Sequence, residues 1–239
     1  MRGAPYRVLD LFSGVGAFSL GLERTGGFQT VAFAEVAPYP SSILKKWWPE
    51  IPNLGDVSSA EYPNADVISA GFPCQDLSVA GKGAGLAGER SGLWREVVRA
   101  IRLVRPRFVL LENVANLLRR GMGKVLGDLA ANGLDAEWDC IPAAHVGAPH
   151  WRDRIWFVAY PERGERWQEP YLRSVGRMGR EQQSVPWDRD WQSALREFRG
   201  VDDGSAYRVD RIDTLRNGLV PQIPEAIGRA ILADERLAA

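Results

Sequence analysis

The sequence predicts an α/β protein with a Rossmann-like, doubly wound and mostly parallel sheet that helices cover on both faces. Short apolar runs of strand character alternate along the chain with amphipathic stretches of helical character. The apolar runs are nearly continuous, which is typical of strands buried on both faces. A turn containing Gly14 and Gly16 separates the first run from the first helical stretch, as in folds that bind a cofactor at this point.

Each element follows from its composition. The apolar runs predicted as strands are residues 6–12, 30–36, 65–72, 107–114, 135–141 and 152–160. The stretches with one apolar face, predicted as helices, are residues 16–26, 39–48, 91–104, 123–133 and 220–238. Pro221 and Pro224 suit the entry and first turn of the last helix.

Residues 161–206 differ from the rest of the chain. They are rich in Arg, Glu, Gln and Trp, have weak periodicity and contain scattered Gly and Pro. We interpret them as an irregular insertion or small subdomain. A disordered linker is the alternative, and the tryptophans argue against it because they favour packing or stacking.

Composition limits the possible functions. The chain has 239 residues, no formal net charge and a pI near 6.8, so a nucleic-acid partner would have to be held by local basic patches. Two cysteines and two histidines supply neither a convincing zinc cluster nor a disulfide framework, so we expect no metal. Since no apolar run approaches the roughly 18 residues of a membrane span, we expect a cytoplasmic protein without a membrane partner.

The glycine turn suggests the kind of cofactor. Glu35 follows Gly14 by 21 residues at the end of the second predicted strand, where an acid can hydrogen-bond a ribose. Ser19 occupies the place of the third glycine of the dinucleotide-binding pattern. A nucleoside-type cofactor without phosphates is therefore favoured over a pyrophosphate dinucleotide, and a purely structural turn is the alternative.

Cys74 and Glu112 point to covalent chemistry. Cys74 follows Pro73 at the end of one predicted strand, and Glu112 lies at the end of the next. Ligands of such sheets bind at the carboxyl ends of parallel strands, so a thiol and a carboxylate are expected to converge there. Taken singly, the cysteine would more often be an apolar filler and the glutamate a solvated strand end.

The motifs resemble those of the DNA cytosine-5 methyltransferases of bacteria and phages. The sequences DLFSGVGAFSLGLERTG, GFPCQDLSVAGKGAGLAGERSGLW, ENV, GAPHWRDRIWFV and RNGLVPQIPEAIGRAI occur in the same order as in that family. The resemblance implies a class I methyltransferase fold, the cofactor S-adenosyl-L-methionine with S-adenosyl-L-homocysteine as product, and double-stranded DNA as substrate.

The resemblance also implies catalytic roles. Cys74 matches the nucleophile that adds to C6 of cytosine, because C5 is a poor nucleophile until the ring becomes an enamine. Glu112 matches the acid that contacts N3 and the exocyclic amine. Arg152 and Arg154 match the paired arginines around a base that must first leave the duplex. His150 stands where the family has a glutamine.

The remaining site residues follow by the same resemblance. Cofactor contacts are expected from Phe12, Gly14, Val15, Gly16, Glu35, Val36, Asp56, Val57, Pro73, Leu93 and Asn217. DNA contacts are expected from Gln75, Ser78, Lys82 and Arg90 in a glycine-rich loop that the family uses as a lid. Glu35 would hold the ribose and Asp56 the adenine amine. Val36 replaces an aromatic of many relatives, and Arg216 replaces a glycine, which could reduce activity.

We therefore predict three parts: a catalytic domain over residues 1–160, a reduced target-recognition segment over 161–206, and a C-terminal motif and helix over 207–239. A monomer in a bacterial or phage-infected cell is expected. Two alternatives stay open: a catalytically impaired DNA-binding member of the same fold, and an RNA (tRNA) cytosine-5 methyltransferase. A nicotinamide dehydrogenase is disfavoured by Ser19.

Overall fold

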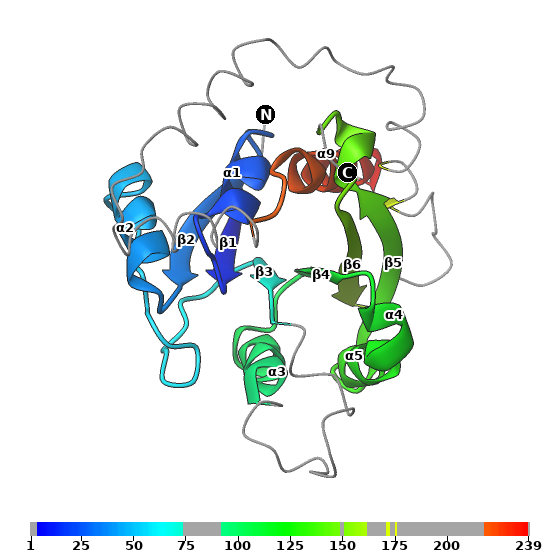
Figure 1. The fold of residues 1–239 in the computed structure, drawn as a ribbon, viewed down its shortest axis with the longest axis horizontal. Helices are drawn as coiled ribbons and strands as arrows, with labels where there is room; N and C mark the ends of the chain where they lie inside the picture. Colours follow the sequence, from blue (N-terminus) through cyan, green and yellow to red (C-terminus); the bar gives the residue numbers. More distant parts are fainter. Residues whose placement is uncertain are drawn as a thin grey trace, which may run out of the picture.

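The computed structural model describes residues 4–73, 92–148, 151–161, 171–172, 175 and 218–238. Six strands form a single sheet in the order β2-β1-β3-β4-β6-β5 (Figure 1). They are β1 (Tyr6–Leu11), β2 (Phe28–Ala34), β3 (Val67–Gly71), β4 (Phe108–Val114), β5 (Leu134–Pro142) and β6 (Asp153–Pro161). β1 to β4 are mutually parallel, whereas β6 runs antiparallel to both β4 and β5. The predicted Rossmann-like α/β fold is confirmed.

Helices cover both faces of the sheet. They are α1 (Ala17–Glu23), α2 (Pro38–Trp47), α3 (Gly92–Val104), α4 (Leu117–Arg120), α5 (Met122–Ala130) and α9 (Gln222–Ala238). Figure 1 shows α1 and α9 on one side of the sheet and α3, α4 and α5 on the other. Because side chains alternate along a strand, β1 sends Leu9 and Leu11 into the core under α3 and Val8 into the core under α1 and α9.

The strand order places a topological switch point between β1 and β3. The chain leaves β1 towards β2 on one side and then crosses to β3 on the other side of β1. The loops that follow these strands therefore diverge at their carboxyl ends. A crevice for a ligand is expected there.

The last helix packs tightly against the first. A Cβ on Gly21 would lie 2.2 Å from the carbonyl oxygen of Pro221, and one on Gly228 would lie within 3.2 Å of Leu22. These two glycines allow α1 and α9 to approach closely. Residues 218–221, which precede α9, are thereby held next to the loop that follows β1.

Three described residues lie within the segment predicted as an irregular insertion. Tyr171, Leu172 and Val175 are buried in the core cluster on the α1 and α9 face. The Glu137 carboxylate accepts hydrogen bonds from the backbone N–H groups of Tyr171 at 2.9 Å and Leu172 at 3.0 Å. This part of the insertion therefore packs on the sheet. The predicted boundaries at residues 160 and 206 remain predictions.

Two short elements were not predicted. α4 comprises only four residues, and a 3-10 helix, η3 (Ala143–Val146), follows β5. Both are too short to show an apolar period. In the described ranges, no helix is long and apolar enough to span a bilayer.

Candidate active site

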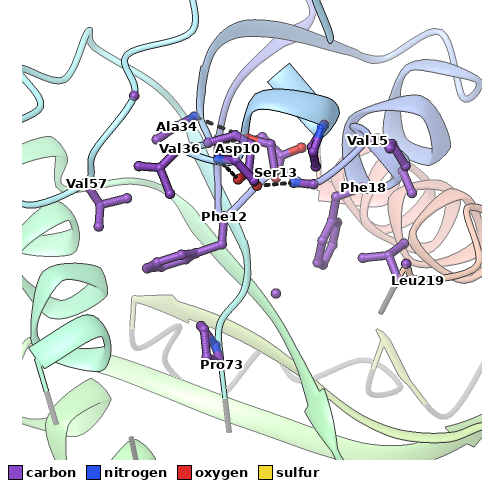
Figure 2. Close-up of a pocket in the computed structure, with 18 of the residues that line it drawn as sticks. Asp10, Phe12, Ser13, Val15, Phe18, Ala34, Val36, Val57, Pro73 and Leu219 are labelled. Atoms are coloured by element: carbon purple, nitrogen blue, oxygen red, sulfur yellow. Dashed lines mark hydrogen bonds between the residues drawn. The ribbon is translucent and has the colours of Figure 1, made fainter. Parts of the chain in front are cut away.

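A pocket of about 560 Å³ lies at the carboxyl ends of β1 to β4, beside the switch point (Figure 2). It is lined by most of the residues predicted to hold the cofactor, namely Phe12, Gly14, Val15, Glu35, Val36, Asp56, Val57, Pro73 and Leu93. In Figure 2, Phe12, Val36 and Val57 lie on one side of the pocket, and Phe18 and Leu219 lie on the other. The strand ends thus bring together residues that are far apart in the sequence.

The pocket wall is acidic. Four carboxylates line it, those of Asp10, Glu35, Asp56 and Glu112. Among the described residues, the lining includes no lysine, arginine or histidine. Asp10 is only 1% exposed and Glu112 is paired with Arg154, so Glu35 and Asp56 give the wall its acidic character towards a ligand. These two carboxylates disfavour a phosphate-bearing ligand and favour one that carries positive charge.

The turn after β1 follows an unusual backbone path. Phe12 and Gly14 adopt positive φ angles of 52° and 53°, and Gly16 follows with a φ of 79°. A Cβ on Gly16 would also lie 2.7 Å from the ring of Trp48. Gly16 is therefore needed for the turn and its packing, and the structure does not place it among the pocket-lining residues.

Glu35 is fixed by the backbone on both sides. One carboxylate oxygen accepts a hydrogen bond from the N–H of Gly14 at 2.8 Å, and the other accepts one from the N–H of Ala37 at 2.7 Å. The Asn53 side chain accepts a hydrogen bond from the backbone N–H of Glu35 at 3.0 Å and donates one to the backbone carbonyl oxygen of Glu35. Each carboxylate oxygen keeps a further lone pair, so Glu35 can accept from two neighbouring hydroxyl groups of a ligand.

The loop between α2 and β3 supplies a second polar group. The Asp56 carboxylate accepts a hydrogen bond from the backbone N–H of Ser58 at 2.8 Å, which lowers the pKa of Asp56. It is exposed and ionised at neutral pH. Val36, at the place of the expected aromatic, is 68% exposed. Its side chain can therefore cover an apolar ring in the pocket.

Asp10 is a buried carboxylate that the sequence reasoning missed. Its two oxygens accept hydrogen bonds from the hydroxyls of Ser19 and Ser69, both at 2.8 Å. Burial raises its pKa to about 7, although the bonds from Ser69 and Ser19 act in the opposite direction. Compared with the glycine pattern, Ser19 is only a missing glycine, but in the structure its hydroxyl holds the Asp10 carboxylate.

Replacing Asp10 by asparagine is expected to change how stability depends on pH. Because the folded pKa lies above the unfolded value, the Asp10 contribution is present in acid and is lost as pH rises through about 7. D10N lacks this loss, so its stability relative to the wild type should rise by up to about 1.4 kcal/mol per pH unit between pH 4 and 7. Urea denaturation across this range measures the difference. A constant difference would contradict the assignment.

Glu112 and two arginines form a second cluster at the pocket wall. Glu112 is 8% exposed, at the end of β4, and its carboxylate lies 2.9 Å from the Nε of Arg154. The antiparallel pairing of β4 and β6 sets Val114 opposite Arg154. Glu112, two residues before Val114 and on the same face of the strand, thereby comes close to the Arg154 side chain. Arg152 also lies close enough to stabilise the negative charge of Glu112.

Two opposing effects set the pKa of Glu112. Burial raises its pKa to about 6, and the charges of Arg154 and Arg152 oppose that rise. Gly71 on β3 pairs with Glu112, and a Cβ at Gly71 would already lie 3.4 Å from the carboxylate. A carboxyl group that is enclosed, oriented and titrates near neutrality is suited to proton donation.

Asn113 connects this cluster to the chain that leads to Cys74. Its side-chain N–H donates to the carbonyl oxygen of Phe72 at 2.8 Å, and its own oxygen accepts from the N–H of Val114 at 2.8 Å. The end of β3 is therefore tied to the end of β4 one residue before Pro73. Sequence reasoning gave Asn113 no role of its own.

Several predicted site residues lie outside the described ranges. They are Cys74, Gln75, Ser78, Lys82, Arg90 and Asn217, together with the departures His150 and Arg216. Their neighbours are informative, because Pro73, Leu93, Gly218 and Leu219 all line the pocket. Within the described ranges, no three His, Cys, Asp or Glu side chains gather as a metal site would require.

Comparison with known proteins decides the family. Residues 6–190 match the family described as C-5 cytosine-specific DNA methylase. The chain belongs to this family. The resemblance inferred from the motifs is thereby confirmed.

Two bacterial relatives of this chain are named type II methyltransferases. The chain is 36% identical over 162 residues to M2.BsuMI of Bacillus subtilis, covering 64% of this chain and 41% of that protein. It is 34% identical over 161 residues to M.HaeII of Haemophilus aegyptius, covering 65% of this chain and 50% of that protein. The chain therefore spans half or less of the length of these two relatives.

Solved structures agree on the fold of this chain. A crystal structure of Spodoptera frugiperda DNMT2 matches with a TM-score of 0.58 at 21% identity, covering 69% of this chain and 52% of that chain. A putative DNA modification methyltransferase from an Escherichia coli prophage matches with a TM-score of 0.52 at 25% identity, covering 65% of this chain and 47% of that one.

Proposed function

We propose that this chain carries the catalytic centre of a DNA cytosine-5 methyltransferase that uses S-adenosylmethionine and a covalent Cys74 intermediate. The observation that carries the proposal is the position of Glu112. This enclosed carboxyl group lies in the wall of the pocket, beside Arg154 and opposite Gly71, two residues before Pro73. Cys74 is the next residue in the sequence.

The described wall fits the proposed cofactor. Glu35 can accept hydrogen bonds from ribose hydroxyls, and Asp56 can accept from an adenine amine. Phe12, Val36 and Val57 supply apolar surface on the same side of the pocket. The carboxylates of Glu35 and Asp56 suit a cationic sulfonium and an α-amino group and would disfavour a pyrophosphate.

The chain's own residues would act on the base. The Cys74 thiolate would add to C6 of an extruded cytosine, while a protonated Glu112 donates to N3 and so neutralises charge that develops on the ring. Arg154 would keep Glu112 aimed at that edge. Bound S-adenosylmethionine would supply a methyl group on its sulfonium for the activated C5. Loss of the C5 proton to a base and elimination of the thiolate would restore the aromatic ring.

A methyl-transfer assay tests the proposal. The purified chain is incubated with S-adenosylmethionine tritiated in the methyl group and a mixture of duplexes rich in cytosine. Label is expected in 5-methylcytosine, and bisulfite sequencing of the product would identify the target. A folded protein that binds the cofactor and labels no duplex would overturn the proposal.

The same assay separates the two alternatives. Transfer to tRNA in preference to duplex DNA in a competition would establish the RNA methyltransferase. Binding of DNA without transfer to either substrate would establish the impaired DNA-binding protein. The proposed assignment of residues 161–206 to target recognition predicts that changes there, other than at the buried Tyr171, Leu172 and Val175, alter the choice of sequence and leave cofactor binding intact.

A further inference from the structure

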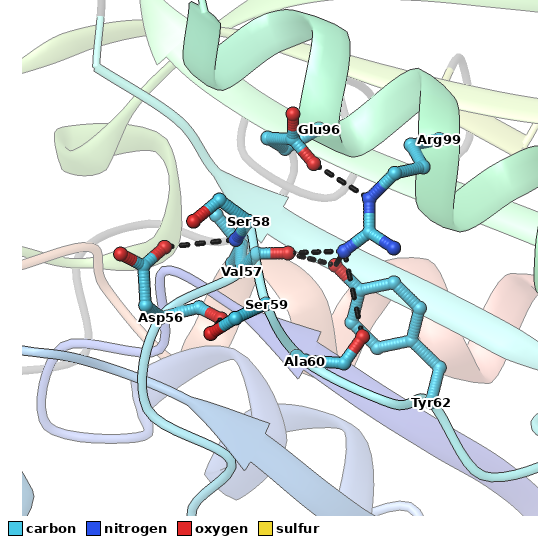
Figure 3. Close-up of polar contacts among 8 residues, drawn as sticks. All are labelled: Asp56, Val57, Ser58, Ser59, Ala60, Tyr62, Glu96 and Arg99. Carbon is cyan, nitrogen blue, oxygen red and sulfur yellow. Dashed lines mark hydrogen bonds and ion pairs between the residues drawn. The ribbon is translucent and has the colours of Figure 1, made fainter.

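Arg99 joins helix α3 to the loop that carries Asp56 and Val57 (Figure 3). One of its terminal nitrogens donates to the carbonyl oxygen of Val57, and the same nitrogen lies 3.4 Å from that of Ala60 and 3.2 Å from the Tyr62 hydroxyl. The Tyr62 hydroxyl in turn donates to the Val57 carbonyl at 2.8 Å. The Val57 carbonyl therefore accepts two hydrogen bonds.

The guanidinium is oriented by contacts on its other sides. Glu96, one turn earlier in α3, accepts from the Nε of Arg99 at 2.6 Å. The guanidinium carbon also lies 5.0 Å from the centre of the Tyr62 ring, in cation-π range. Glu96 thus binds the guanidinium at its Nε, and a terminal nitrogen of the guanidinium faces the loop. Only a planar, multiply donating group can serve both edges at once.

These contacts fix two walls of the pocket relative to each other. Asp56 and Val57 line the pocket from the loop, and Leu93 lines it from the first turn of α3. Arg99 lies two turns further along the same helix and is not itself a lining residue. Its position therefore sets the spacing between the loop and the helix without direct contact with a ligand.

We propose that Arg99 is a positioning residue for cofactor binding, which holds the Asp56–Val57 wall at the distance from α3 that an adenine ring requires. The proposal rests on the proposed function, because it takes the ligand of the pocket to be an adenosyl compound. Loss of Arg99 should loosen the loop and weaken adenosyl binding. It should leave the chemistry at Glu112, on the neighbouring strand end, unchanged once the cofactor is saturating.

Calorimetric binding of S-adenosylhomocysteine to the full chain is the test. R99K, which keeps the charge but not the fork, is expected to raise the Kd about tenfold, as for the loss of a hydrogen bond from a charged group. Y62F, which removes only the hydroxyl bonded to Val57, should raise it about threefold. R102A is the matched control on the same helix, since exposed Arg102 bonds Asn132, away from the pocket, and should bind like the wild type.

A double-mutant cycle with D56A separates positioning from general stability. If Arg99 acts through this loop, R99K in the D56A background should weaken binding much less than it does in the wild type. In steady-state transfer, R99K should raise the KM for S-adenosylmethionine with little change in kcat.

The possible results are distinct. The inference would be overturned if the wild type binds S-adenosylhomocysteine and both R99K and Y62F bind it with the same Kd. A fully additive double-mutant cycle would overturn it as well. Either result would leave the proposed function standing. Failure of the folded wild type to bind S-adenosylhomocysteine would overturn both the proposed cofactor and the inference that rests on it.

Discussion

Replacing Glu112 by glutamine is expected to lower the rate of methyl transfer by about 100- to 10,000-fold, the usual range for loss of a positioned acid. Glutamine keeps the size of the side chain and can still accept from Arg154, but it cannot donate a titratable proton to the base. Single-turnover transfer with saturating cofactor and DNA measures the chemical step directly.

Stability and binding are the controls for E112Q. Burial raises the pKa of Glu112 to about 6 because it disfavours the charged carboxylate, and a neutral amide at the same position avoids that cost. The variant should therefore unfold no more easily than the wild type near pH 8. Binding of S-adenosylhomocysteine should stay within a factor of a few. A variant that folds, binds and transfers methyl groups at the wild-type rate would show that Glu112 is not the acid.

Replacing Arg154 by methionine is expected to lower the free energy of unfolding by about 3 kcal/mol near pH 8, because it leaves a mostly buried carboxylate without its ion-pair partner. The pKa of Glu112 should rise further, since the charge of Arg154 is the largest effect that lowers it. A raised pKa means stability that is lost as pH rises, so the destabilisation of R154M should grow from pH 5 to pH 8.

Two variants check that the effect passes through Glu112. R154K keeps the charge and should recover part of the lost stability. The double variant E112Q/R154M has no buried carboxylate at this position and should be more stable than R154M alone. Equal stability of R154M and the double variant at pH 8 would contradict the assigned ion pair.

The fold was largely readable from the sequence because most elements are long enough to show their pattern. The apolar runs at residues 107–114 and 152–160 correspond to β4 and β6, and the amphipathic stretch at 91–104 corresponds to α3. Periodicity carries no information about strand direction, however. The insertion of β6 antiparallel between β4 and β5 therefore required the structure.

The pocket was predictable to the extent that its residues stand at strand ends. Glu35 and Glu112 could be placed because each directly follows or ends an apolar run at the same edge of the sheet. Residues that act through tertiary contacts could not. Arg99 contacts the Val57 carbonyl 42 positions away, and Asn113 contacts that of Phe72 41 positions away.

Ser19 shows how a motif can mislead. Compared with a glycine pattern it is an omission, and that comparison gives no reason for a hydroxyl. In the structure its hydroxyl donates to Asp10, whose other oxygen accepts a hydrogen bond from Ser69 on the neighbouring strand β3. An aspartate in the apolar run of the first strand was the signal that could have predicted this role, since a buried carboxylate requires hydrogen-bond donors.

Covalent trapping tests the central claim most directly. The wild-type chain and C74S are incubated with S-adenosylmethionine and duplexes in which 5-fluorocytosine replaces cytosine in one strand. Fluorine at C5 cannot leave as a proton does, so a thioether to C6 should persist. The account predicts a protein–DNA adduct that survives denaturation, maps to the peptide containing Cys74 and is absent from C74S. Transfer of methyl groups to ordinary cytosine without any such adduct, or an equal adduct in C74S, would contradict it.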